Sequence, residues 1–525
     1  MRERSGTSTM TIAAILLAAS TIGSRVLGYL RDVIIATTLG ASAETDAYYA
    51  AFLLPDALMY FLAGGALSIA FVPIFIRLKE QKGEEVAWTL FRNIGTVGTC
   101  LLAMGLLVGY AFTPEIVKAY VPEFTAEQHH LTVRLTRIIL PAPIFFYLGG
   151  LLGATEVADR RFQSTALAPL IYNGCIIMGG LLLAPWLGVE GFSWGVLAGA
   201  ALGPFGINFW FARKHADMRP YMHLRSEELR GYFIITLPLM LGVGLTTVDE
   251  WFGRYFASGL EAGSISWLNN ARRLMLFPIA LLGQAIGQAA LPFLSNLAQA
   301  GDEEGFHDSL RGTLASTALL SAAVATGLAA LASVAVGLVY GYGAYGSTDV
   351  QQTGILLAAF CLAVPAWSLQ AVAARGFYAR SHTLPPMIAS TIAVVLSLPL
   401  YWILSDLYGV VGLALAAGVA ITGQLALVVV AYRIQYGASL WASILQYSAR
   451  GVLAALPGSA LAWWLVRSFW STDASFGTTL WVSVVGSLVY AACTLPLLLV
   501  IGAEAAHPVR ARIAQVSAKL GGRGA

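Results

Sequence analysis

Five charged side chains lie in stretches too apolar for an ordinary solvated surface, and they are the residues best suited to chemistry. Arg25, Arg31 and Asp32 fall in one such stretch, and Arg272 and Arg273 fall in another. Charge at membrane depth is costly, so it usually lines a water-filled cavity that serves an ion or a substrate. Arginine also offers a planar fork that holds phosphate through two hydrogen bonds. These residues therefore predict an anionic cargo.

The spacing of the first cluster predicts how its side chains are arranged. Arg25 and Asp32 are seven residues apart, close to two helical turns, so they should share a face, while Arg31 should point elsewhere around the helix. The alternative is that these charges snorkel or pair only to hold helices together. Arg272 and Arg273 have no acid within the next two turns, so we expect water or an anion beside them. Their alternative role is to line a cavity without touching the substrate.

Three acids need separate consideration. Asp249 is the best candidate for binding a coupling cation, whereas Glu250 and Arg254 have the i,i+4 spacing of a simple ion pair. Asp46 stands where a loop meets the second predicted helix. It is a candidate functional acid, with a favourable interaction with the helix dipole as the alternative.

Composition identifies the class of protein. The chain has 525 residues, of which 58% are hydrophobic and 11% are charged, and its mean hydropathy is +0.72. Soluble proteins carry roughly 25% charged residues, so an all-α polytopic membrane protein is predicted. The four cysteines are far apart and show no metal-ligand or redox spacing. Because there is no phosphate-binding loop, zinc-protease motif or nucleophile triad, we expect no enzyme activity, no cofactor, no metal and no nucleic-acid partner.

Segments of about 20 mostly apolar residues mark the membrane spans. About fourteen satisfy this criterion, and their approximate ranges are 10–38, 46–76, 88–113, 128–156, 163–185, 190–213, 230–258, 263–297, 308–340, 350–380, 385–405, 410–434, 446–467 and 476–502. Lys and Arg gather in alternate connections, which predicts that both termini are cytoplasmic. The first span should be an uncleaved helix. The predicted parts are an N-terminal lobe (1–213), a cytoplasmic amphipathic linker (214–229), a C-terminal lobe (230–434), two further spans (435–502) and a cytoplasmic tail (503–525).

Several of these segments together resemble one known family. The segments 24–32 (SRVLGYLRD), 45–52 (TDAYYAAF) and 65–73 (GALSIAFVP), followed by Arg273-Leu274-Met275 and 376–380 (GFYAR), are similar to the MurJ/MviN lipid II flippases of the MOP exporter superfamily. The resemblance covers about residues 8 to 435. It implies two six-helix lobes around a central cationic cavity, and two C-terminal helices that form a groove for the lipid tail.

The resemblance also implies a function and a location. A member would flip lipid II, a polyprenyl-pyrophosphate-linked saccharide, across the bacterial inner membrane by alternating access. Arg25, Arg31, Asp32 and Arg273 match cavity residues of the family, and Asp46 matches a functionally important acid. The partners would be the lipid-linked substrate and membrane lipids, with a monomer that works beside the cell-wall synthesis machinery.

The chain departs from the family pattern at some positions. A family arginine is replaced by Met59, and Arg272 could restore that charge; a family aspartate is replaced by Gly253, and an Asn-rich pattern by Ser397 and Tyr401. The last changes put a sodium site in doubt. The alternative functions are export of another polyprenyl-pyrophosphate-linked oligosaccharide, an integral-membrane glycosyltransferase, or a membrane scaffold. The short external connections argue against the transferase, and buried arginines argue against the scaffold.

Overall fold

The computed structural model describes the backbone of residues 2–63, 71–159, 161–241 and 245–521. Side chains are described over the same ranges except residues 2–19, 61–63, 235, 237–241, 245–246, 248–249 and 501–521. Within these limits the structure is helical and contains no strand. The chain forms two compact units, Met1–Val243 and Gly244–Ala525, and each is described by itself.

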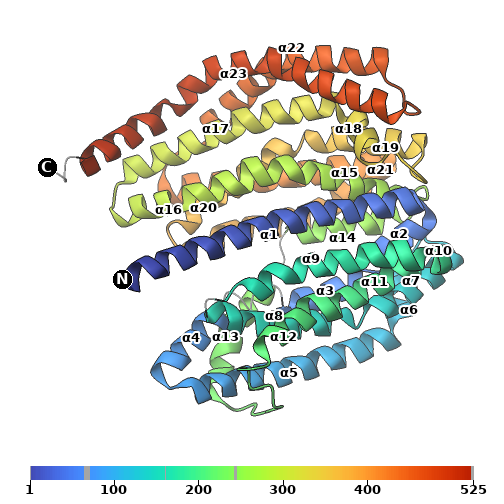
Figure 1. Ribbon diagram of the computed structural model, residues 1–525. Coiled ribbons are helices and arrows are strands. Elements are labelled where there is room, and N and C mark those ends of the chain that lie inside the picture. The colour runs from blue at the N-terminus through green and yellow to red at the C-terminus, as the bar shows by residue number, and fades with distance from the viewer. Residues whose placement is uncertain (1, 64–70, 160, 242–244, 522–525) are drawn as a thin grey trace. The chain divides into compact units, whose positions relative to one another are not determined.

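The described part of the first unit is helical (Figure 1). The π-helical segments η2 and η3 extend the helices that precede them. The elements are α1 (Arg2–Leu39), α2 (Ala43–Ala50), α3 (Leu53–Ala63), α4 (Val72–Gln81), α5 (Glu84–Ala111), α6 (Thr113–Tyr120), α7 (Ala126–Ile139), α8 (Ala142–Ala158), α9 (Gln163–Met178), η2 (Gly179–Leu183), α10 (Ala184–Leu187), α11 (Glu190–Ala200), η3 (Ala201–Ile207), α12 (Asn208–Ala212) and α13 (Glu227–Leu241).

The second unit has the longest helices of the chain. Its elements are α14 (Leu245–Ala257), α15 (Ser264–Ile279), η4 (Ala280–Ala285), α16 (Ile286–Gln299), α17 (Glu303–Ala330), α18 (Ala332–Tyr340), α19 (Ser347–Cys361), α20 (Val364–Tyr378), α21 (Leu384–Tyr436), α22 (Trp441–Phe469) and α23 (Phe476–Gly521). The helices α17, α22 and α23 lie side by side (Figure 1).

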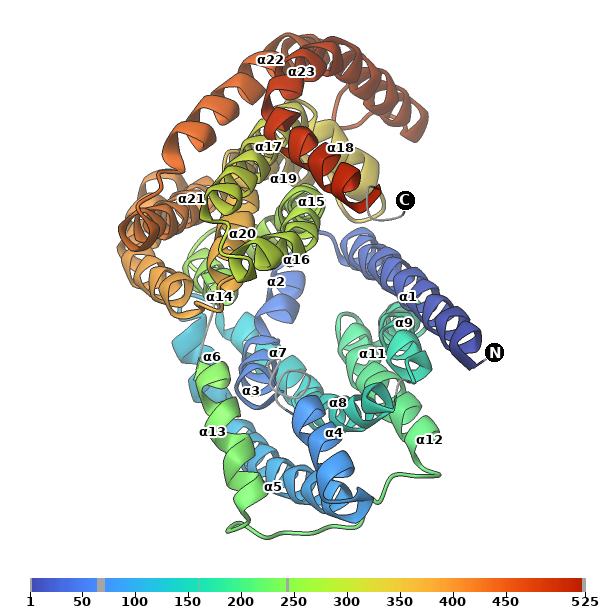
Figure 2. The ribbon, with the colours of Figure 1, turned by 90° about the vertical axis from the view of Figure 1, so that its left-hand side faces the viewer.

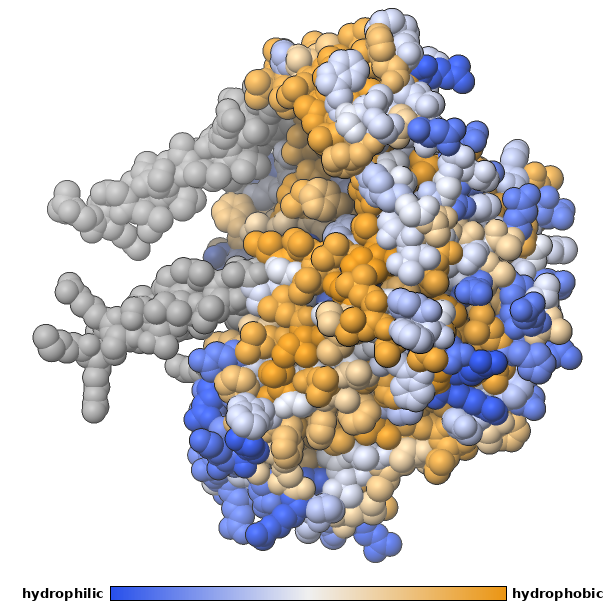
Figure 3. All heavy atoms as spheres, turned by 45° about the vertical axis from the view of Figure 1, so that its right-hand side comes forward, coloured by the Kyte–Doolittle hydropathy of each residue, from blue (hydrophilic) through white to orange (hydrophobic). Residues whose placement is uncertain are grey.

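The predicted all-α membrane fold is confirmed. Within the described residues, nine helical segments are long and apolar enough to cross a membrane, and the pair α19 and α20, bent by 43°, makes ten if it is counted as one span. A helix suits hydrocarbon because it satisfies its own backbone hydrogen bonds. On the face shown in Figure 3, apolar residues predominate and hydrophilic residues gather towards its edges.

Individual helices differ from the predicted spans in instructive ways. The predicted span 46–76 is divided among α2, α3 and α4, and residues 64–70 between the last two lie outside the described part. By contrast, the division between the spans predicted at 385–405 and 410–434 is present. The range α21 covers both spans, and the non-helical Gly409 separates two helices within it, with a φ of 57° that is unfavourable for other residues. The first helix continues through residues 24–28, as expected.

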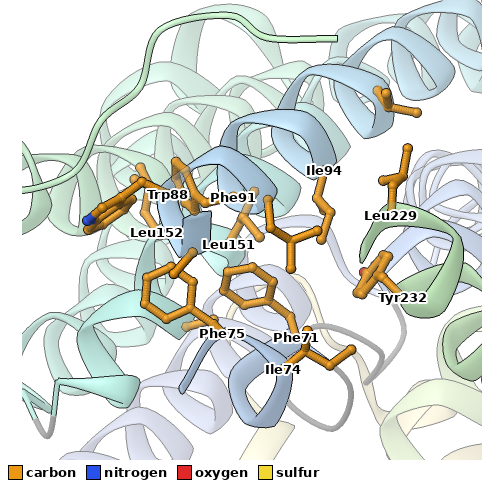
Figure 4. Packing of buried hydrophobic residues seen from close by; sticks show 14 of the residues in the cluster. Phe71, Ile74, Phe75, Trp88, Phe91, Ile94, Leu151, Leu152, Leu229 and Tyr232 are labelled. Carbon is orange, nitrogen blue, oxygen red and sulfur yellow. The ribbon is translucent and has the colours of Figure 1, made fainter. Parts of the chain in front are cut away.

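An aromatic core holds α4, α5, α8 and α13 together in the first unit. Figure 4 shows Phe71, Phe75, Trp88 and Phe91 packed against one another, with Leu151 and Leu152 of α8 beside them. A Cβ atom at Gly98 would lie 1.9 Å from the Tyr147 hydroxyl. That hydroxyl donates to the Ile94 carbonyl at 2.8 Å. A glycine at position 98 is therefore what lets α5 and α8 approach closely.

The connection from α12 to α13 is held against the first unit. It passes the ends of α4 and α5 (Figure 2). The buried Asn93 side chain accepts from the His223 backbone N–H at 2.9 Å and donates to the His223 carbonyl at 2.9 Å. The predicted linker 214–229 is thus an ordered and mostly non-helical segment up to Ser226, where α13 follows.

Side-chain hydrogen bonds tie both ends of this connection to the unit. His215 Nε2 lies 2.7 Å from the buried Glu156 carboxylate, and Lys82 Nζ donates to Glu228 at 3.0 Å. The hydrogen bond from Lys82 is the main reason that the pKa of Glu228 lies below its usual value. The linker is therefore held near both of its ends.

Candidate functional site

The first charged cluster is built on α1 and α9. The Arg31 guanidinium donates to Asp32 Oδ1 from Nε at 3.0 Å and from Nη2 at 2.8 Å, and its Nη1 donates to Asn173 Oδ1 at 3.2 Å. Asn173 in turn donates to the Pro169 carbonyl at 3.0 Å, which fixes its amide orientation. Asp32 is buried, whereas the Arg31 side chain keeps 18% of its surface exposed. Arg31 is thus positioned for a further anionic partner.

Arg31 and Asp32 form the ion pair that the sequence allowed as an alternative. Consecutive helical residues point about 100° apart, which follows from 3.6 residues per turn, but the long Arg31 side chain bends back to reach its neighbour Asp32. Arg25, two turns earlier, is exposed. No hydrogen bond or ion pair joins Arg25 to another group within the described part of the chain. The structure therefore joins Asp32 to Arg31 and leaves Arg25 on an exposed face of α1.

Asp46 lies in the first turn of α2 and is buried. Ser42 caps this helix, since its hydroxyl accepts from the Thr45 backbone N–H at 3.3 Å. An acid at this position interacts favourably with the helix dipole. Burial of an acid beside a helix start fits both the functional and the structural interpretation of Asp46.

The second cluster stands on α15, whose orientation is set by buried polar contacts. Trp267 Nε1 donates to Asp349 Oδ1 at 2.9 Å, at the start of α19. Asn270 donates to the Tyr345 hydroxyl at 3.3 Å, and that hydroxyl also contacts Thr353. Asn270, Tyr345 and Asp349 were not predicted from the sequence. The paired amides Asn269-Asn270 in an apolar helix were the available signal.

Arg272 and Arg273 lie on the less buried side of α15. The Arg272 guanidinium carbon lies 5.6 Å from the centre of the Phe360 ring, a cation–π distance. Arg272 and Asn269 also line a small cavity of about 30 Å³ together with Glu250 and Arg254. The cavity is large enough for one water molecule. The predicted Glu250–Arg254 ion pair is present, at a distance of 3.8 Å.

The region expected to hold a coupling cation is aromatic. Tyr401 of α21 stacks on Phe256 with ring centres 6.0 Å apart and meets Phe252 edge-on at 5.7 Å. Ser397 turns its hydroxyl to the Val394 carbonyl of its own helix at 2.7 Å. Asp249 lies on α14, but its side chain is outside the described part. Among the described residues, no group of three or more His, Cys, Asp or Glu side chains could hold a metal ion.

Comparison with known proteins identifies relatives over most of the chain. The family model "Lipid II flippase MurJ" matches residues 35–485. A lipid II flippase MurJ of Burkholderia cenocepacia is 31% identical over 418 residues, which cover 78% of this chain and 80% of that protein. A probable lipid II flippase MurJ of Bdellovibrio bacteriovorus is 28% identical over 425 residues, covering 78% and 79% of the two chains.

Solved structures support the same fold. The inward closed conformation of a lipid II flippase MurJ matches with a TM-score of 0.77 and 24% identity, covering 93% of this chain and 99% of that one. An inward-facing multidrug resistance transporter of the MATE family, in the MOP superfamily, matches with a TM-score of 0.66 and 14% identity, covering 79% of this chain and 94% of that one. The resemblance found in the sequence is confirmed.

Proposed function

The chain belongs to the lipid II flippase MurJ family, and from this premise we propose that it flips lipid II from the cytoplasmic to the outer leaflet of the inner membrane. The family is one of transporters. The curated relatives support lipid II above the export of other polyprenyl-linked saccharides or a glycosyltransferase activity.

The contacts of Arg31 are the main observation that supports the proposed substrate binding. Its guanidinium is held by Asp32 and Asn173, and the side chain keeps 18% of its surface exposed. A preorganised arginine binds a phosphate oxygen at lower entropic cost than a freely rotating one. We assign the pyrophosphate of lipid II to Arg31 together with Arg25, Arg272 and Arg273. Asp32 acts as the residue that positions Arg31.

Transport follows from alternating access. The substrate enters from the cytoplasmic leaflet, the arginines hold the pyrophosphate, and rearrangement of the helices exposes it to the other leaflet. No covalent step is needed, because the cargo leaves as it entered. Both termini and residues 214–229 are assigned to the cytoplasmic side, and the transporter works as a monomer beside the cell-wall synthesis machinery.

Complementation in a strain whose own lipid II flippase can be depleted tests this function. Expression of this chain is expected to restore growth and normal cell shape under depletion. The Arg273→Ala variant, made at equal membrane level, should not restore them. Failure of the wild-type chain despite normal membrane insertion would contradict the proposed function.

A further inference from the structure

A cavity in the first unit has no part in the proposed transport site. It has a volume of about 340 Å³ and lies between α5, α8, the η3–α12 region and the linker. This volume is within the roughly 300–1,000 Å³ of small-molecule sites. Its lining is mostly apolar, and its walls are residues Phe91, Gly95, Thr96, Thr99, Cys100, Leu148, Leu151, Leu152, Phe205, Phe209, Met218 and Pro220, with Arg92 and Arg219. We call it the linker groove.

One end of the linker groove opens onto the lipid-facing side of α5. Cys100 lines the groove and is exposed, and Met104 and Leu107, at i+4 and i+7 from it, are exposed by 59% and 73%. These spacings place the three residues on one helical face. α5 is apolar enough to span the membrane, so this exposed face meets hydrocarbon. An acyl chain can therefore enter the groove sideways from the bilayer.

The other end of the groove is cationic. Arg92 and Arg219 are the charged residues of the lining. Arg92 is engaged, since its Nη1 donates to Asp217 at 2.9 Å and its Nη2 to Thr89 at 3.0 Å. The Arg219 side chain is exposed and forms no ion pair within the described residues. Its charge is therefore available to an anion at the groove mouth.

Neighbouring residues place this mouth at the level of the lipid head groups. Trp210 is 59% exposed, and the Arg213 guanidinium carbon lies 3.5 Å from the centre of its ring. Exposed Trp beside Arg is typical of the membrane interface. Tyr221, Met222 and Leu224 of the linker are also exposed, as in segments that rest on a lipid surface.

We propose that the linker groove binds an anionic glycerophospholipid of the cytoplasmic leaflet, with an acyl chain between α5 and α8 and its phosphate at Arg219. Among the described lining residues, Arg219 is the cation without an ion pair. The apolar linker groove with Arg219 at its mouth therefore matches a lipid with one tail in the groove and an anionic head group at the mouth. Because the linker connects α12 to α13 across the groove, a lipid bound here would also hold residues 218–220 against α5.

Native mass spectrometry of the purified full-length protein tests this site. The probes are phosphatidylglycerol and phosphatidylcholine with identical acyl chains, and glycerol phosphate as a head group without chains. The protein is expected to retain phosphatidylglycerol best and glycerol phosphate not at all. Equal retention of the two phospholipids, or retention of glycerol phosphate alone, would overturn the proposal.

Two pairs of variants locate the binding. Arg219→Gln should weaken phosphatidylglycerol binding about fivefold, the effect of one cationic side chain near an anionic lipid surface, and leave phosphatidylcholine unchanged. Arg225→Gln is the matched control, since Arg225 is exposed in the same linker but lines a different cavity. Equal losses for the two variants would show diffuse attraction instead of a site. Arg219→Lys should still prefer phosphatidylglycerol to phosphatidylcholine, because it keeps the positive charge. This variant controls for a loss of binding that is caused by misfolding.

The second pair concerns the acyl chain. Cys100→Trp fills the groove and should reduce the retention of both phospholipids, whereas Leu101→Trp, on the adjacent exposed position outside the lining, should not. Identical behaviour of these variants would contradict a chain in the groove. Preferential retention of undecaprenyl phosphate over phosphatidylglycerol would assign the groove to the transported lipid and would also overturn the proposal.

Discussion

Arg31 and Asp32, consecutive on α1, form a hydrogen-bonded ion pair through a single carboxylate oxygen, at 3.0 Å from Nε and 2.8 Å from Nη2. Asp32 is only 3% exposed, so its charge depends on partners within the protein. The same guanidinium reaches Asn173 on α9. The pair therefore has a structural role at the α1–α9 contact in addition to the binding role proposed for Arg31.

A double-mutant comparison separates these two roles. Arg31→Gln should lower the free energy of unfolding of the purified protein by on the order of 3 kcal/mol, because the buried Asp32 carboxylate loses the cation with which it pairs. Arg31→Gln combined with Asp32→Asn should recover most of that stability. Transport should stay lost in both variants, since neither has the arginine. Recovery of transport in the double variant would assign Arg31 a structural role alone.

Arg273 should behave differently from Arg31. It has no comparable acid next to it in sequence, so Arg273→Ala is expected to abolish transport while membrane levels stay nearly normal. Arg273→Lys should rescue poorly, because lysine keeps the charge but loses the planar fork. Complementation and immunoblotting measure the two effects. Arg467→Ala, at an exposed arginine beside Trp463, is the control that should transport normally; growth with Arg273→Ala would refute the assignment.

The proposed topology can be checked by labelling in a cysteine-free background. Pro220→Cys, in the linker, should react with a membrane-impermeant maleimide only after the cells are opened. Asp406→Cys is the matched control, since Asp406 is exposed in a connection assigned to the other side. It should be labelled in intact cells. Labelling of position 220 from outside would reverse the orientation.

The aromatic packing around Tyr401 predicts that transport does not require Na⁺. A dehydrated Na⁺ ion needs several convergent oxygen ligands. In this region the Tyr401 ring is packed by Phe252 and Phe256, and Ser397 is bonded within its own helix. A membrane potential could instead bias the charged carrier, at about 2.3 kcal/mol per charge per 100 mV.

Transport in proteoliposomes at a clamped potential, with Na⁺ replaced by choline or K⁺, measures the requirement. The rate should be unchanged by the replacement. A rate that falls to background without Na⁺ and returns on its addition would contradict the prediction, and Asp249→Asn would then be the first variant to examine.

The sequence was sufficient to predict the helical membrane fold and the family, but it was not sufficient to predict which side chains contact one another. Apolar segments and the residues from Ser24 to Asp32 predicted the helical membrane fold and the family. Pairing of Arg31 with Asp32 was only one of two alternatives, because helical spacing describes where a side chain leaves the backbone and not where a long side chain ends. Asn173 lies 142 residues from Arg31, and no local pattern connects them.

The division of the second predicted span illustrates a different limit. Hydropathy over 46–76 is continuous, but α2 ends at Ala50 and α3 starts at Leu53. Hydropathy measures how well a segment tolerates lipid, and it does not record where the helix axis is interrupted. The linker groove could not be predicted from the sequence either, since its walls come from four segments that meet only in the folded unit.

Reconstituted flipping of lipid II tests the central claim most directly. The purified chain would be placed in liposomes that carry lipid II in both leaflets, and the fraction accessible to an external modifying enzyme would be followed with time. The account predicts that the wild-type chain makes the inner pool accessible and that Arg273→Ala, equally reconstituted, leaves it protected. Protection of the inner pool by the wild-type chain under an imposed potential, or equal rates for the two proteins, would contradict it.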